Sequence, residues 1–204
     1  PDLETRTNVT TLLLSDLVTT PELLLEFVDG GGVEVLIENI KLTSNSRLPR
    51  YSYLLLSMIA DSNFGRKKIL RYRVVETIIQ DVEMAIKKPN DVDPLLVFNV
   101  LRFLEVCSQH EDTILFIKES NGLTTILKFI QSHWIPSVDY STLLCIPALG
   151  SLRHLVFFDS QLREQVIQQT SFLQLLYSIA TGEPIPDPLP SPSGSTAPAS
   201  SSSS

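Results

Sequence analysis

The feature that most constrains the fold of this chain is an apolar stripe that returns four times at helical spacing. In each copy the apolar residues stand at positions i, i+3, i+4 and i+7, the pattern of an α-helix with one buried face. The copies begin at residues 33, 75, 123 and 172, so they are 42, 48 and 49 residues apart. Self-similarity at this period predicts an array of helical repeats. The stripes consist of Val33, Leu36, Ile37 and Ile40; Val75, Ile78, Ile79 and Val82; Leu123, Ile126, Leu127 and Ile130; and Phe172, Leu175, Leu176 and Ile179.

A second apolar series keeps step with the stripes and indicates a longer helix ahead of each one. In this series a leucine is followed fourteen positions later by another apolar residue. Two series that drift together arise by chance far less readily than one. They divide the chain into a partial first unit, units near residues 30–70, 71–117 and 118–167, and a terminal half unit to residue 181. The pairs are Leu14 and Val28, Leu55 and Ile69, Leu101 and Leu115, and Leu152 and Val166.

The composition indicates a folded, acidic protein. Hydrophobic residues make up 43% of the chain, enough for a sizeable core, yet no apolar run approaches the roughly 18 residues of a membrane-spanning helix. A net charge of −7 argues against a dominant nucleic-acid surface, because phosphate binding needs a positive field. Cys107 and Cys145 lack CxxC spacing and lie in apolar pattern, as buried free thiols do in a reducing compartment. We expect a cytoplasmic or nuclear protein and favour the cytoplasm.

The two ends of the sequence differ from the repeats. The chain opens with Pro1 rather than methionine, which indicates a segment of a longer polypeptide. After Gly182, prolines occupy alternate positions from 184 to 192 and serines close the chain, a composition that cannot pack a core. We therefore expect a helical-repeat domain over residues 1–182 and a disordered Pro/Ser-rich linker or tail over residues 183–204.

The sequence offers no catalytic or cofactor-binding pattern. His110, His133 and His154 lie in different repeats without the spacing of a zinc site. The glycines at 30–32 lack the lysine and the serine or threonine of a phosphate loop, and no GxSxG nucleophile motif occurs. We therefore expect no enzyme, no metal and no cofactor.

The order of parts in each repeat resembles the armadillo repeat: a long apolar helix, a short helix, a turn that often holds glycine, and then the stripe. The segments that begin at Gly32 and Gly122 (GVEVLI and GLTTIL) resemble the point where an armadillo repeat enters its third helix. The second copy carries Val74 where glycine is expected, and the longer later repeats leave HEAT-like geometry open. The resemblance covers about residues 9–181. It implies an all-α, right-handed armadillo-like helical-repeat solenoid.

In armadillo-like arrays the outward face of the stripe helix lines a concave groove, so the resemblance also implies where partners would bind. The outward positions form two columns, and these change from acidic and polar to more aromatic along the array. Exposed aromatic residues are expected anchors for a partner. The alternative is that Phe129 and Trp134 cover the next repeat or the connection after it. The candidates are Asn39, Asp81 and Phe129 in one column with Ser178, and Glu38, Gln80, Lys128 and Tyr177 in the next, with Trp134 beyond them.

One basic cluster could bind phosphate, RNA or an acidic peptide. The stronger interpretation is that these cations complement the dipole at the end of a helix near Leu70. The net charge disfavours nucleic-acid or phosphoinositide binding. The cluster consists of Arg66, Lys67, Lys68, Arg71 and Arg73.

These observations predict a binding scaffold. Stacked repeats form a core together and leave an extended surface free. The leading hypothesis is a non-enzymatic protein-interaction module within a larger scaffold, such as a ubiquitin-ligase, trafficking or cytoskeletal assembly, that binds a peptide or helix along its concave face. The alternative is a structural solenoid that packs against other domains of its own chain.

Overall fold

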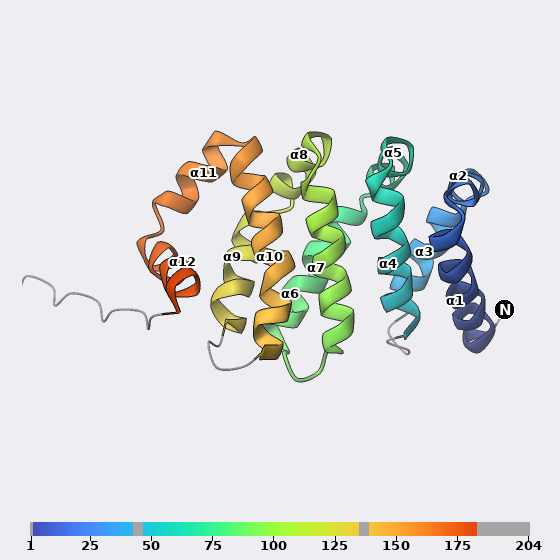
Figure 1. Ribbon diagram of the computed structural model, residues 1–204, viewed down its shortest axis with the longest axis horizontal. Helices are drawn as coiled ribbons and strands as arrows, with labels where there is room; N and C mark the ends of the chain where they lie inside the picture. Colours follow the sequence, from blue (N-terminus) through green and yellow to red (C-terminus); the bar gives the residue numbers. More distant parts are fainter. Residues whose placement is uncertain (1, 43–46, 135–138, 183–204) are drawn as a thin grey trace, which may run out of the picture.

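The structure is a computed structural model that describes residues 2–42, 47–134 and 139–182. Every regular element in these ranges is a helix, which confirms the all-α class (Figure 1). The tail expected over residues 183–204 lies outside the described residues. In chain order the helices are α1 (Leu3–Thr19), α2 (Pro21–Asp29), α3 (Gly32–Ile40), α4 (Arg47–Asp61), α5 (Asn63–Arg71), α6 (Val74–Lys87), α7 (Pro94–Ser108), α8 (Glu111–Glu119), α9 (Gly122–His133), α10 (Asp139–Phe158), α11 (Ser160–Ile167) and α12 (Thr170–Thr181).

The helices form four successive triples, each with a long first helix, a short second helix and a third helix that carries the stripe. In Figure 1 the first helices α1, α4, α7 and α10 stand side by side, the third helices α3, α6 and α9 lie behind them, and the short helices form the upper row. The predicted units began at the third helix of each triple. The predicted partial first unit therefore contains α1 and α2 of a triple that α3 completes, and the predicted half unit is α12, the third helix of the last triple.

Helices α1, α5, α7 and α11 begin where a polar side chain caps free backbone N–H groups. The Ser62 hydroxyl accepts a hydrogen bond from the Gly65 N–H at 3.0 Å and starts α5. The Asp93 carboxylate accepts one from Leu95 at 3.0 Å, just before the proline that opens α7. These caps set the sharp corners between consecutive helices of the array.

The apolar stripes form the core between the two layers, as predicted. All stripe residues are buried except Leu176 and Ile179 of α12, which are partly buried against the same core. The second apolar series is confirmed only in part. Leu101 is buried, but its predicted partner Leu115 is 58% exposed, and Ile117 occupies the buried position instead. The shift has a geometric cause. α7 extends one residue further beyond its leucine than α4 does, and the connection to α8 has two residues where Ser62 alone joins α4 to α5.

The turn into each of the first three stripe helices uses one residue with positive φ directly before the helix. These residues are Gly31 (φ 90°), Arg73 (φ 53°) and Asn121 (φ 59°). The glycine that follows serves close packing instead, because a Cβ on Gly32 would lie 2.3 Å from the Phe27 ring. The left-handed turn at Arg73 therefore explains how the second copy keeps the same corner while carrying valine at position 74.

A membrane span was not expected, and among the described residues no single helix is long and apolar enough to cross a membrane. The segments Thr142–Phe158 and Ser160–Ile167, bent by 120° at their junction, meet the length and composition criteria only as a pair.

Candidate binding surface

One of the two columns of candidate residues is exposed on the third helices. We call Glu38, Gln80, Lys128 and Tyr177 the exposed row, because each is exposed and each comes from a different triple. Tyr177 is 54% exposed, which leaves much of its ring accessible. The row thus places an acid, an amide, a cation and an aromatic ring along the array.

The other column does not face outward, and this part of the prediction is wrong. We call Asn39, Asp81, Phe129 and Ser178 the seam column. Asn39, Phe129 and Ser178 are buried and Asp81 is half-buried. With 3.6 residues per turn, this position lies about 60° around the helix from the nearest stripe residue, so it points toward the first helix of the same triple.

The contacts of the seam column show what it does. Asn39 accepts a hydrogen bond from Arg6 of α1 at 3.4 Å, and Asp81 accepts one from the hydroxyl of Tyr53 in α4. The Phe129 ring is fully buried and stacks on His133 with ring centroids 4.1 Å apart. Phe129 is therefore buried and is not an exposed anchor for a partner. Trp134 is half-buried and packs against the core, so it also differs from the exposed anchor that the sequence suggested.

The basic cluster is largely occupied in joining triples. Arg66 is buried; its Nε donates to Asp112 of α8 at 2.9 Å and its Nη1 to the Ala60 carbonyl at 3.0 Å. Lys68 donates to the Val28 carbonyl of α2 at 3.2 Å. Arg73 pairs with Glu76. Only Lys67 and Arg71 are exposed without an ion pair to a described residue, so the cluster is not a continuous cationic patch.

The same arrangement continues along the short helices. Lys118 of α8 donates to Asp159 of α11 at 2.8 Å, as Arg66 of α5 does to Asp112 of α8. The Lys118 ammonium holds the pKa of Asp159 below its usual value. Cation–carboxylate contacts therefore join α5 to α8 and α8 to the start of α11, while Lys68 joins α5 to the Val28 carbonyl of α2.

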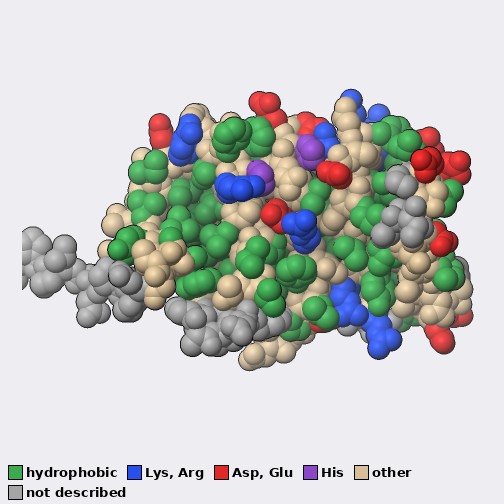
Figure 2. All heavy atoms as spheres, in the orientation of Figure 1, with side chains coloured by type: hydrophobic (Ala, Val, Ile, Leu, Met, Phe, Trp, Pro, Cys, Tyr) green, Lys and Arg blue, Asp and Glu red, His purple; other side chains and the backbone are tan. Residues whose placement is uncertain are grey.

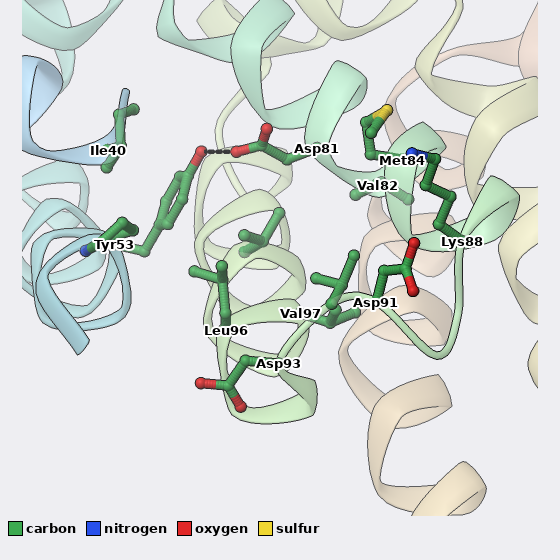
Figure 3. A pocket seen from close by; sticks show the side chains of 13 residues that line it. Ile40, Tyr53, Asp81, Val82, Met84, Lys88, Asp91, Asp93, Leu96 and Val97 are labelled. Atoms are coloured by element: carbon green, nitrogen blue, oxygen red, sulfur yellow. Dashed lines mark hydrogen bonds between the residues drawn. The ribbon is translucent and has the colours of Figure 1, made fainter. Parts of the chain in front are cut away.

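A pocket of about 350 Å³ opens between α4, α6 and α7 (Figure 3). We call it the Asp81 pocket. Its wall is mostly apolar, with Asp81 and Tyr53 on one side and Lys88 and Asp91 on the other. Its apolar lining includes Val82, Leu96, Val97 and Val100. Sequence analysis singled out Asp81 but not this pocket, because α4 and α7 supply its other walls.

The Asp81 carboxylate has an unusual environment for a charged group. Burial raises its pKa, and the hydrogen bond from Tyr53 only partly offsets that effect. Burial likewise raises the pKa of the Tyr53 phenol, so the tyrosine acts as a neutral donor. The nearby carboxylate Asp93 differs, because Arg50 lies 3.8 Å from it. The pocket therefore combines an apolar wall with a carboxylate that is poorly compensated.

A second hollow of about 300 Å³ lies between α1 and α3 and is lined by the seam residue Asn39. Here Arg6 supplies a cation beside both Asn39 and Glu38. Across the described parts of the chain, no group of three or more His, Cys, Asp and Glu side chains is arranged to hold a metal ion.

Comparison of the chain with protein-family models, with curated proteins and with solved structures gives no match in any of the three.

Proposed function

We propose that this chain is a non-enzymatic protein-interaction module, an armadillo-like right-handed solenoid within a larger scaffold, that binds a peptide or helix along its third helices. The observation that carries this proposal is the exposed row, together with the Asp81 pocket, whose Asp81 directly follows the row residue Gln80 on α6. Such a surface crosses several triples, which suits an extended partner, since each repeat adds contacts along one line. The two cysteines, buried and reduced, favour a cytoplasmic protein.

The row supplies varied contacts rather than one field of charge. Tyr177 offers a large rigid ring at low entropic cost, the kind of residue that dominates interface energies. Lys128 and Glu38 at different places along the array would fix the direction of a charged partner. We therefore expect the partner to lie along the array in one orientation.

A second candidate function rests on a different observation. The first helix of the last triple exposes Leu143, Ile146 and Phe157, which are 54%, 54% and 74% accessible. Figure 2 shows hydrophobic side chains gathered over the α10–α12 end of the molecule. Exposed apolar surface of this kind favours the alternative that the solenoid packs against another domain of its own chain.

Selection of peptides from a display library with the purified protein, followed by affinity measurement, separates the two functions. A variant with Gln80, Lys128 and Tyr177 replaced by alanine should lose at least about tenfold in affinity for selected peptides. The matched control replaces Leu143, Ile146 and Phe157 by alanine and should bind as the unmodified protein does. The reverse outcome, with both variants folded, would reject the third-helix face in favour of the α10 face.

A further inference from the structure

Asp81 lacks the ionic partner that a carboxylate in apolar surroundings normally has. Among the described residues, the Tyr53 hydroxyl is the one group that donates to it, and no Lys, Arg or His nitrogen lies within 4.0 Å. Removing a charge from water is costly unless a counter-charge or several hydrogen bonds compensate it. A carboxylate left in this state would gain from a cation delivered from outside the chain.

The geometry around Asp81 limits the shape of that cation. Val82, Leu96 and Val97 line the pocket beside it, so the body of the ligand is apolar. Figure 3 shows Lys88 and Asp91 on the far side of the pocket, away from the Tyr53–Asp81 hydrogen bond. Lys88 makes no ion pair with Asp81 within 4.0 Å, so a ligand's cation can approach the Asp81 carboxylate from the pocket.

We propose that the Asp81 pocket binds a lysine side chain of the partner peptide, a step that rests on the proposed function. Lysine carries a four-carbon apolar stem that ends in a compact ammonium, which matches an apolar wall with one carboxylate. Arginine fits less well, because its fork pairs best with both carboxylate oxygens and Oδ2 already accepts from Tyr53. A purely apolar side chain would leave the carboxylate desolvated, and an acidic one would meet Asp81 and Asp91.

The size of the pocket agrees with a side-chain ligand. Its volume of about 350 Å³ lies near the lower end of the roughly 300–1,000 Å³ range of sites for small molecules. A single lysine would fill part of it and leave room for the peptide backbone at the mouth. The pocket would then set the register of the peptide, while the exposed row binds the residues on either side.

The test uses the whole protein and three short peptides, acetyl-Gly-Gly-Lys-Gly-Gly-amide and its counterparts with norleucine or glutamate in place of lysine. Binding is followed by NMR through the methyl signals of Val82, Leu96 and Val97. The lysine peptide should shift these signals and bind about tenfold or more tightly than the norleucine peptide, the effect of one hydrogen bond to a charged group. The glutamate peptide should not bind.

Two variants test whether Asp81 provides the preference for lysine and whether Leu96 lines the binding site, and a third variant serves as a control. Asp81→Asn should remove the preference for lysine over norleucine, whereas the exposed Glu164→Gln, with the same change in net charge, should keep it. Leu96→Phe narrows the pocket without altering the carboxylate and should weaken binding of the lysine peptide. Equal binding of lysine and norleucine peptides, an unchanged preference in Asp81→Asn, or shifts confined to other residues would overturn the proposal.

The outcome is separable from that of the proposed function. If the lysine peptide binds at Asp81 while alanine substitution of the exposed row leaves selected peptides unaffected, the proposed function fails and the pocket stands. If selected peptides depend on the row but lack a lysine preference at Asp81, the pocket assignment fails and the proposed function stands.

Discussion

Asp112 and Asp159 lie between triples beside a cation of the neighbouring triple, whereas Asp81 lies between α4 and α6 beside a neutral tyrosine. Arg66 donates to Asp112 at 2.9 Å and Lys118 to Asp159 at 2.8 Å. The pKa of Asp159 is lowered, chiefly by the hydrogen bond from Lys118, while burial raises that of Asp81. The aspartates that face a cation are therefore well compensated, whereas Asp81, which faces a neutral tyrosine, is poorly compensated.

The two cases differ in whether the fold itself supplies a cation to the carboxylate. Arg66 and Lys118 on the short helices are paired with carboxylates of the next triple. Among the described residues, no cation pairs with the half-buried Asp81 carboxylate, so its burial weakens the fold there. Groups that are poorly compensated in the native state are candidates for ligand contacts, because a ligand can supply what the fold does not.

The largest loss of stability is expected when the buried Arg66 is replaced. Arg66→Ala should lower the free energy of unfolding by about 2–3 kcal/mol, because hydrogen bonds between charged and buried partners are lost. Urea denaturation measures this directly. The exposed neighbour Lys67→Ala is the matched control and should stay within about 0.5 kcal/mol of the unmodified protein. Equal effects at both positions would mean that the Arg66–Asp112 contact does not join the triples.

Removing the Tyr53 hydroxyl, which donates to Asp81, should lower the stability of the fold somewhat less. Tyr53→Phe should destabilise the fold by about 1–2 kcal/mol, since the half-buried carboxylate loses its hydrogen bond. Tyr51→Phe makes the same chemical change on the same helix, where the ring stacks beside Arg50, and should have little effect. Thermal unfolding of the pair, followed by circular dichroism, distinguishes them. A Tyr53→Phe protein as stable as Tyr51→Phe would show that Asp81 needs no donor.

The contact between α8 and α11 should have a smaller effect, because both side chains retain some exposure. Lys118→Met should lower the free energy of unfolding by about 0.5–1 kcal/mol. The loss should shrink in high salt, which screens a partly exposed ion pair. Lys128→Met, in the exposed row, serves as the control, and a salt-independent loss at Lys118 would point to packing instead of charge.

The smallest effects concern pH, and they should have opposite signs for the two kinds of aspartate. The folded pKa of Asp81 is raised above 3.8, so the unmodified protein loses stability relative to Asp81→Asn as pH rises from 3.8 through that folded pKa. The folded pKa of Asp159 is lowered, so its contribution is present above pH 3.8 and is lost as pH falls through the folded value. Denaturation curves from pH 3 to pH 7 should therefore diverge in opposite directions for Asp81→Asn and Asp159→Asn.

The repeat architecture could be predicted from sequence because it depends on local periodicity. A stripe at i, i+3, i+4 and i+7 determines which face of a helix is buried, whatever the neighbour is. The exposed row could be predicted for the same reason, since Glu38 and its equivalents lie opposite the stripe. Asn39 and Asp81 were misplaced because a polar residue at the edge of a stripe was assigned to solvent, although its position around the helix places it in the seam.

The candidate site could not be predicted, because it depends on residues far apart in the chain. Nothing near Asp81 in the sequence indicates that Tyr53 lies against it or that Leu96 faces it across a pocket. The role of Arg66 was hidden for the same reason, since Asp112 follows it by 46 residues. Sequence patterns report the faces of helices, but the pairing of side chains between helices requires the assembled fold.

The most direct test of this account is the pKa of Asp81 in the folded protein, measured by NMR from its side-chain carboxyl signal with and without the acetyl-Gly-Gly-Lys-Gly-Gly-amide peptide. The account predicts a value above 3.8 in the free protein and a fall when the peptide binds, because a nearby ammonium favours the ionised carboxylate. A value at or below 3.8 in the free protein, or no change at saturating peptide, would contradict it.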